Sequence, residues 1–188
     1  MLAAMPITTR ELTRRLWPDL EHLLERKFGG CWCWFWRLER GEKWADVKGD
    51  EAKRRMRGAV RRGRVMGILA YDGGEPIGWC AFGPKPSYPR LARAPSLRTD
   101  DAERVWSLPC FVVQPKHRRR GVATKMLAAA VAAIKRRGGR VVEGYPIEAK
   151  RPFWPAATYT GTVPMFERCG FDLVQLRPAG KQRMRRGT

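Results

Sequence analysis

Apolar residues recur three and four positions apart in the first part of the chain, a spacing that predicts an amphipathic helix. These residues are Leu12, Leu16, Leu20, Leu23 and Leu24. Thr8 or Thr9 is expected to cap this helix, because a hydroxyl oxygen accepts a hydrogen bond from the unpaired N–H groups of a first turn. Pro18 is expected to break the helix and Gly29-Gly30 to end it.

Three later segments show the same period. Residues 50–62 predict a strongly basic helix, and residues 122–137 predict a helix with a single apolar stripe. Residues 163–168 predict a short helix that Cys169-Gly170 closes.

Shorter apolar runs bounded by glycine or proline predict strands. They cover residues 31–38, 65–71, 76–82, 104–113, 140–145, 171–176 and 182–185. Asp72-Gly73-Gly74 is typical of a hairpin turn, and residues 84–103 read as a long loop with room for a short helix. This order of helices and strands predicts an α/β fold in layers on a mixed sheet.

The first of these strands is rich in tryptophan. Alternate side chains of a strand face opposite ways, so Trp32, Trp34 and Trp36 are expected to share one face that packs on a helix or lines a cleft. The cysteines are scattered at positions 31, 33, 80, 110 and 169. Without ligand spacing or an export signal, they are expected to be buried thiols, with no metal site and no disulfide framework.

The charge balance is unusual, with 38 basic and 18 acidic residues among 188, a formal net charge of +20. Such a balance favours phosphate-rich partners but does not choose between nucleic acid, an anionic membrane surface and a phosphorylated cofactor. A basic surface without a specific partner is the simplest interpretation. No apolar run approaches the roughly 18 residues of a membrane span. We expect a cytoplasmic protein without membrane contact.

The most informative segment is the basic turn at 114–121, between the strand at 104–113 and the helix at 122–137. A helix N-terminus presents unpaired N–H groups and the positive end of its dipole, and both attract phosphate. Gly121 and Ala123 leave the backbone accessible, and Lys116, His117 and the three arginines that follow surround it with positive charge. The segment lacks the glycine spacing of a dinucleotide-binding loop and the Gly-Lys-Ser/Thr of a P-loop.

Arg118-x-x-Gly121-x-Ala123 resembles the Arg/Gln-x-x-Gly-x-Gly/Ala signature of the GNAT (GCN5-related N-acetyltransferase) family. Further along, Phe166-Glu167-Arg168-Cys169-Gly170-Phe171 resembles the family's C-terminal tyrosine and Gly-Phe motif. The resemblance covers residues 65–177 and, more loosely, the whole chain. Segments such as Gly78-Trp79-Cys80 are also similar to an uncharacterised bacterial subgroup of the family.

The resemblance implies a mixed, mostly antiparallel sheet with two splayed parallel strands and helices on both faces. The splayed strands would be residues 106–113 and 140–145. Residues 1–188 would form one acetyltransferase domain. In it, 1–64 supply substrate-side helices and a first strand, 65–145 the core with the cofactor loop, and 146–188 the C-terminal part.

The resemblance also implies acetyl-CoA as co-substrate. Its pantetheine arm would pair with the backbone of Phe111, Val112 and Val113. Its pyrophosphate would bind backbone N–H groups of Arg118, Arg119, Arg120, Gly121, Val122, Ala123 and Thr124. Arg118 or Arg119 is a further candidate for the adenosine phosphate. Phe166 belongs to the same site, at the position where the family often has a tyrosine that protonates the departing thiolate, and Thr160 stands where many members have an asparagine.

The implied reaction is direct attack of a neutral amine on the thioester, which calls for a base and an acid. Glu143 is the candidate base, since a carboxylate among apolar residues of the second splayed strand would have a raised pKa. A paired, structural glutamate is the alternative. Tyr159 and Tyr145 are candidate substitutes for the missing tyrosine, and Cys169 is another.

Two other functions stay open. The charge, the basic helix and the tail from Lys181 to Arg186 suit a nucleic-acid- or ribosome-associated protein, although no recognition motif accompanies them. The second alternative function is a GNAT fold that binds CoA without catalysis. The amine acceptor is not identified, and an aromatic cleft suits a cationic amine or a planar ring. Monomer and homodimer are equally compatible with the sequence.

Overall fold

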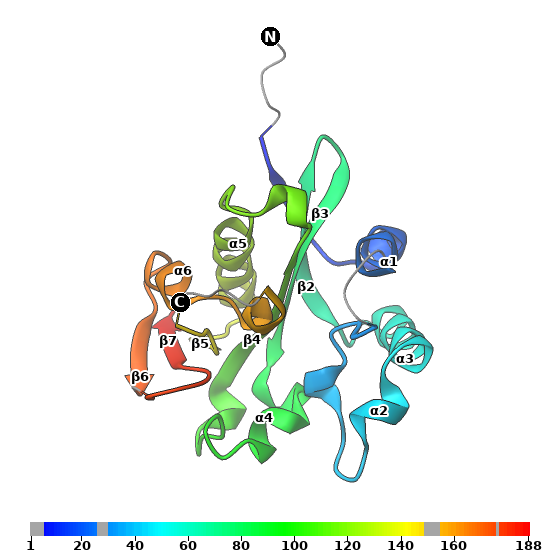
Figure 1. The fold of residues 1–188 in the computed structure, drawn as a ribbon. Helices are drawn as coiled ribbons and strands as arrows, with labels where there is room; N and C mark the ends of the chain where they lie inside the picture. The colour runs from blue at the N-terminus through cyan, green and yellow to red at the C-terminus, as the bar shows by residue number, and fades with distance from the viewer. Residues whose placement is uncertain (1–5, 26–29, 149–154, 176) are drawn as a thin grey trace.

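The computed structural model describes residues 6–25, 30–148, 155–175 and 177–188. Its centre is a seven-stranded sheet in the order β1-β2-β3-β4-β5-β7-β6 (Figure 1). The strands are β1 (Thr8–Glu11), β2 (Met66–Asp72), β3 (Glu75–Pro84), β4 (Val105–Val113), β5 (Val141–Gly144), β6 (Asp172–Gln175) and β7 (Arg183–Gly187). Only β4 and β5 run parallel, and the other neighbours are antiparallel.

Helices cover both faces of the sheet, as expected. The α-helices are α1 (Trp17–Glu25), α2 (Trp44–Val47), α3 (Asp50–Arg61), α4 (Pro89–Arg93), α5 (Val122–Arg136) and α6 (Val163–Glu167). Short 3₁₀ helices are η1 (Arg14–Leu16), η2 (Phe35–Arg37), η3 (Lys85–Ser87), η4 (Ala102–Arg104), η5 (Pro115–His117) and η6 (Pro155–Thr160). None of the helices in the described residues has the length and apolarity that crossing a bilayer requires.

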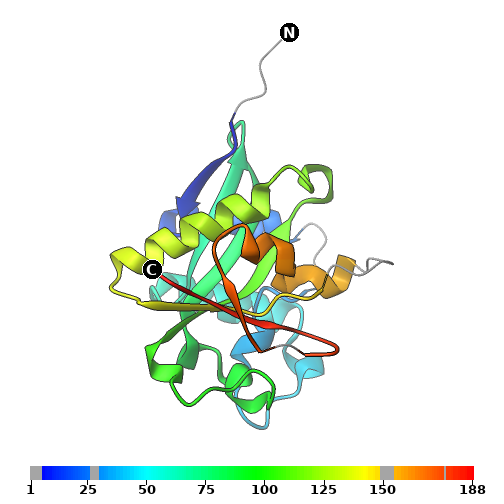
Figure 2. The same ribbon diagram turned by 90° about the vertical axis from the view of Figure 1, so that its left-hand side faces the viewer.

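Each face of the sheet has its own apolar core. The stripe of α5 crosses one face, where it packs on β3 and β4 together with α6 (Figure 2). Helices α1 and α3 and the segment around Trp32 pack on the other face. A third cluster, which includes Trp36, Tyr88 and Tyr145, joins α4 to the end of β5. The alternation of β4 therefore separates two environments, with Phe111 on the α5 side and Cys110 on the α1 side.

The parallel pair opens part of the way along. Pairing begins at Val105↔Val141 and ends at Leu108↔Gly144, whereas β4 continues to Val113. On its other edge β4 pairs with β3, and the register shifts between the pairs Ala81↔Cys110 and Gly83↔Ser107. Between these two pairs, one residue of β3 lies opposite two residues of β4. Such a bulge bends a strand. The bulge lies where β5 leaves β4, and the two strands splay there as the resemblance implied.

The expected strand at 31–38 is wrong. Trp32 and Cys33 have positive φ angles of 47° and 52°, which an extended strand excludes, and η2 follows them. Consequently the tryptophans do not share a face: Trp32 stacks on Trp17 with centroids 6.1 Å apart, and Trp36 joins the third cluster. The β-propensity of the aromatic residues is overridden by their packing against separate parts of the core.

The first helix also starts later than expected. Thr8 and Thr9 do not cap it but pair with Tyr71 and Ala70 as the edge strand β1. The helix begins at Trp17, which places Pro18 in its first turn, where no backbone N–H is needed. Pro18 thus initiates the helix and does not break it. The expected stop at Gly29-Gly30 falls largely outside the described residues.

Candidate active site

The basic turn joins the free end of β4 to α5. After Val113 the chain makes one turn of 3₁₀ helix, and the N–H of Arg118 closes that turn on Pro115. Arg119 and Gly121 then adopt positive φ angles of 59° and 74°. A Cβ added to Gly121 would meet no atom within 4 Å, so the space above this backbone is open.

Backbone donors converge on that space. The N–H groups of residues 119–124 donate to no described residue, and the first bond at the helix start is that of Lys125 to the carbonyl of Gly121. An array of unpaired N–H groups at a helix N-terminus is a site for phosphate. Arg118 was predicted to offer its backbone N–H to the pyrophosphate, but that N–H is bonded to the carbonyl of Pro115. The remaining residues of the loop fit a pyrophosphate.

The side chains of the loop divide into two groups. Arg120 donates to Asp72 at 2.8 Å and contacts His117 Nδ1 at 2.8 Å, which ties the loop to the β2–β3 hairpin. Arg118 and Arg119 are exposed, and neither forms an ion pair with a described carboxylate. Arg120 thus has a structural partner, while Arg118 and Arg119 are available to a ligand.

Beyond Leu108, one edge of β4 lacks a strand partner. The N–H of Gln114 donates to Ile77 of β3, and bonding direction alternates along a strand. The backbone groups of Phe111 and Val113 therefore face the β5 side, whereas those of Val112 face β3. Phe111 and Val113 are the better placed of the predicted pantetheine contacts.

Phe166 lies against the point where the strands separate. It is fully buried, with its ring edge-on to Phe111 at 6.0 Å and to Phe171 at 4.9 Å. A Cβ on Gly144 would approach the Phe166 ring to 2.0 Å, so this glycine makes room for the ring. The phenyl group is part of the core here and carries no proton to donate.

Thr160 has a buried hydroxyl group without a hydrogen-bond partner in the described residues. It closes η6, which packs beside β4 at the edge that β5 leaves open. A buried polar atom without a partner costs free energy unless a ligand or water satisfies it. This orphaned oxygen next to the open edge fits a site for a polar cofactor arm.

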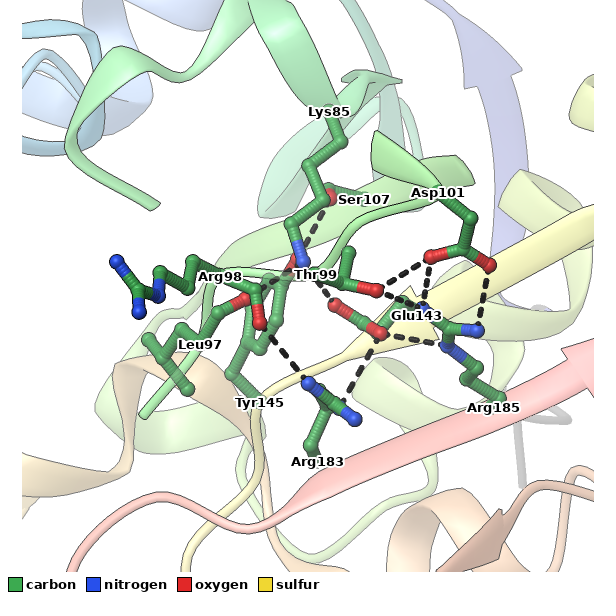
Figure 3. A network of polar contacts seen from close by, with 10 residues as sticks. All are labelled: Lys85, Leu97, Arg98, Thr99, Asp101, Ser107, Glu143, Tyr145, Arg183 and Arg185. Carbon is green, nitrogen blue, oxygen red and sulfur yellow. Dashed lines mark hydrogen bonds and ion pairs between the residues drawn. The ribbon is translucent and has the colours of Figure 1, made fainter. Parts of the chain in front are cut away.

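Glu143 is fully buried next to the last residue of β5 that pairs with β4, and basic side chains surround it (Figure 3). Lys85 Nζ donates to one of its oxygens at 2.5 Å, and Arg185 Nε donates to the other at 2.6 Å. Arg183 Nε lies 3.5 Å from the second oxygen. Arg185 also forms two 2.8 Å bonds with Asp101, which hold the pKa of that carboxyl well below its usual range.

These surroundings differ from the apolar environment expected for Glu143. Each oxygen of Glu143 accepts a hydrogen bond from a basic side chain, so the carboxylate is tied to the fold on both sides. Desolvation lowers the pKa of Lys85, whereas its bond to Glu143 opposes that shift. The geometry matches the paired glutamate that was the alternative interpretation, and the role of Glu143 as a base stays a prediction.

The candidate tyrosines lie in different settings. The Tyr145 hydroxyl is fully buried and 2.7 Å from Ser107 Oγ. Tyr159 is half-buried on η6, packs against both the cluster of Cys110 and that of Trp36, and its hydroxyl bonds to no described residue. Burial raises the pKa of Tyr159, so the phenol keeps its proton at neutral pH. Tyr159 is the freer proton donor of the two.

The thiols are free in the described structure, and all but the partly exposed Cys31 are buried. The sulfurs of Cys33 and Cys110 lie 3.0 Å apart, and this contact together with burial raises the pKa of the Cys110 thiol. Cys169 Sγ contacts the carbonyl of Thr124, at 3.8 Å. Among the described residues no group of histidine, cysteine or acidic side chains has the arrangement of a metal site.

Sequence reasoning missed the partners of Glu143. Lys85 was placed in a loop, and Arg185 was assigned to a basic tail. A lysine among prolines and an arginine in a closing strand carry no signal of burial. Alternation in the last strand, which turns Arg183 and Arg185 to one side and Met184 to the other, was the available clue.

Comparison with known proteins agrees with this geometry. The model of the acetyltransferase (GNAT) family matches residues 17–171. A search of curated proteins by sequence gives no match.

Solved structures give the fold. A GNAT family N-acetyltransferase (YhbS) from Escherichia coli in complex with CoA is 16% identical, with a TM-score of 0.58 over 100% of this chain and 84% of that one. A putative GNAT acetyltransferase from Desulfovibrio desulfuricans is 16% identical, with a TM-score of 0.57 over 97% and 99%. The PaiA N-acetyltransferase from Thermoplasma acidophilum, in complex with coenzyme A, is 14% identical, with a TM-score of 0.52 over 98% and 100%.

The family model spans most of the chain, including the splayed strands, the loop at 118–124 and Gly170-Phe171. Acetyl-CoA is the co-substrate of this family, in keeping with the unpaired N–H groups of the loop. The chain belongs to the GNAT family of acetyltransferases.

Proposed function

We propose that this protein transfers the acetyl group of acetyl-CoA to the nitrogen of an amine acceptor. The observation that carries the proposal is the set of unpaired N–H groups at residues 119–124, placed at the end of a strand whose partner has left it. From Leu108 to Val113, β4 spans roughly 17 Å at the usual rise of a strand. One open strand edge thus joins a phosphate site to the point where β4 and β5 separate.

The chain supplies distinct contacts along this edge. The backbone N–H groups of residues 119–124 hold the pyrophosphate, and Arg118 and Arg119 add charge on the solvent side. Phe111 and Val113 offer backbone groups to the pantetheine arm, and the orphaned Thr160 hydroxyl offers a further hydrogen bond.

Acetyl-CoA supplies an activated thioester carbonyl and a thiol as leaving group. We assign proton donation to the leaving group to Tyr159, because its phenol is protonated and has no described hydrogen-bond partner. Tyr145 and Glu143 are bonded to other side chains, and we assign them to holding the separation point of the strands in shape. Replacing Tyr159 by Phe is expected to lower kcat and to leave acetyl-CoA binding unchanged.

Calorimetry with acetyl-CoA tests the proposal first, and turnover of an amine library read by thiol release tests it second. We expect binding with a Kd below about 100 μM, equivalent to about 5.5 kcal/mol. Binding without turnover of any amine would favour a CoA-binding fold without catalysis, and absence of binding would sink the proposal.

The ion pairs of α3 weaken the nucleic-acid alternative. Lys53 pairs with Glu21 and Glu25, and Arg54 and Arg55 pair with Glu51. Part of the charge that suggested a phosphate-binding helix is therefore matched within the chain, whereas Arg57, Arg61 and Arg62 are exposed and form no ion pair with a described residue. Retention on heparin that tracks RNA binding remains the result that would revive this alternative.

A further inference from the structure

Cations and aromatic rings gather on the α1 side of the point where β4 and β5 separate. Arg90 lies over the ring of Phe35 at 4.0 Å, and Arg37 lies over the ring of Tyr88 at 4.5 Å. Lys181 contacts two rings, with its Nζ 5.1 Å from the centroid of Tyr159 and 5.9 Å from that of Trp36. We call these three cations and their rings the cation–aromatic cluster.

The cluster adjoins the proposed reaction site through Tyr159 and Trp36. Tyr159 packs against the core of Cys110, which lies on the unpaired part of β4. Trp36 belongs to the same core cluster as Tyr145, the first residue after β5, and its ring lies 6.5 Å from that of Tyr159. Rings of the cluster therefore lie beside both strands at the place where they diverge.

No carboxylate balances these cations. Neither Arg37, Arg90 nor Lys181 forms an ion pair with a described residue, and Arg37 bonds only to the Ser87 carbonyl and the Tyr88 hydroxyl. The segments that the structure does not describe, 1–5, 26–29, 149–154 and 176, contain no Asp or Glu. The missing negative charge cannot come from them.

Lys181 shows the imbalance most clearly. Its side chain is half-buried, and desolvation lowers the pKa of its ammonium group with no opposing carboxylate. In the neighbouring Glu143 network, by contrast, every buried cation has a carboxylate within reach. The Nε1 of the buried Trp36 also donates to no described residue. The cluster has donors and positive charge in excess of its acceptors.

We infer that the acceptor is an anionic amine, a primary amine that also carries a carboxylate or phosphate group, and that the cation–aromatic cluster binds this group. The inference rests on the proposed acetyl transfer and names its substrate class. It speaks against the cationic amine that was one of two acceptors suggested by the aromatic residues, because the ring faces that would bind a foreign cation already hold Arg37, Arg90 and Lys181.

The same charges act on the reacting nitrogen. A nearby positive charge disfavours the ammonium form of an amine and so increases the fraction of neutral nucleophile. The cations attract the anionic group of the acceptor into the cluster, and they promote transfer of the ammonium proton to solvent water before the neutral amine attacks the thioester. Such a site can activate the amine without Glu143 acting as a base, since both oxygens of Glu143 already accept hydrogen bonds.

Paired acceptors test the inference with the intact protein and acetyl-CoA. Each pair differs only by the anionic group: phenylalanine with phenethylamine, tryptophan with tryptamine, and phosphoethanolamine with ethanolamine. We expect kcat/KM of the preferred anionic amine to exceed that of the partner without the anionic group at least about 10-fold, which corresponds to the free energy of one charge-assisted hydrogen bond. The amino-acid pairs test a carboxylate, and the phosphoethanolamine pair tests a phosphate group.

Lys181→Met locates the effect. It should raise KM for the anionic amine about 10-fold and leave KM for acetyl-CoA unchanged. Lys135→Met is the matched control, since Lys135 is exposed on α5 and outside the cluster, and it should change neither KM.

The outcomes separate the two proposals. Protein that acetylates other amines but none of the anionic ones, or that prefers spermidine or the partners without an anionic group, contradicts the inference alone. An unchanged anionic-amine KM in Lys181→Met contradicts it as well. Binding of acetyl-CoA without turnover of any amine contradicts the proposed function, and so does failure to bind acetyl-CoA.

Discussion

Two basic regions of this molecule use the same types of side chain in opposite ways. Around Glu143, Lys85 and Arg185 are hydrogen-bonded to the buried carboxylate, and Arg183 lies within ion-pair distance of it. In the loop at 118–124, Arg118 and Arg119 are exposed without a carboxylate, and the backbone donors beside them are unpaired. One region satisfies its charges within the chain, and the other leaves its donors for a ligand.

The difference shows how little a basic residue type says by itself. An arginine beside a buried carboxylate contributes to the fold, whereas one beside an unpaired helix N-terminus contributes to binding. The substitutions below should therefore change stability in the first region and acetyl-CoA affinity in the second.

Glu143→Gln should have the largest effect. It leaves Lys85, whose side chain is 2% exposed, and two arginines around an uncharged amide. Breaking a buried ion pair from one side costs about 3–5 kcal/mol, which urea unfolding followed by tryptophan fluorescence can measure.

Lys85→Met and the double variant serve as its controls. The double variant should lose less stability than the sum of the two single losses, because each single change strands the partner. Full stability of Glu143→Gln together with lost turnover at every pH would instead identify Glu143 as the base.

A pair of glycines sharpens the contrast at the loop. Gly121 and Gly138 have φ angles of 74° and 77° at opposite ends of α5, and a Cβ on either would meet no atom within 4 Å. Either change to Ala should cost about 1–2 kcal/mol of backbone strain.

Only Gly121→Ala should also weaken acetyl-CoA binding, by about 10-fold or 1.4 kcal/mol in calorimetry, since its methyl group enters the proposed phosphate space. Equal affinities in the two variants would remove the loop from the binding site.

The smallest expected effect concerns Asp101 at the edge of the Glu143 network. Bonds from Arg185 and Thr99 lower the pKa of Asp101 below its ordinary 3.8. The stabilisation is therefore complete above pH 3.8 and is lost as the pH falls through the lower pKa of the folded state.

Because the Asp101 side chain is 40% exposed, we expect less than about 1 kcal/mol from it. Asp101→Asn should flatten the acid limb of stability against pH, and Asp46→Asn, at an exposed carboxylate without a described ion pair, should not. An unaltered acid limb in Asp101→Asn would place the acid sensitivity elsewhere.

Local pattern accounts for much of the fold. The apolar stripe of α5, the basic helix α3 and the Gly73-Gly74 hairpin lie where periodicity and turn chemistry put them. The segment at 31–38 fails the same reasoning, because positive φ angles at Trp32 and Cys33 send neighbouring aromatic residues into different cores. One residue in a non-extended conformation shifts the side chains that follow to other faces, so alternation along the segment no longer predicts which residues share a face.

The sequence by itself determined the local form of the loop proposed for phosphate, since a strand end, a glycine and a helix start adjoin one another within residues 113–124 and need only local geometry. The tertiary structure alone decided the role of Glu143, whose partners Lys85 and Arg185 are 58 and 42 positions away. It also decided the charge of the proposed acceptor site, where Arg37, Arg90 and Lys181 meet only after the sheet has formed. Electrostatic environment depends on neighbours in space, and a pattern along the chain records neighbours in sequence.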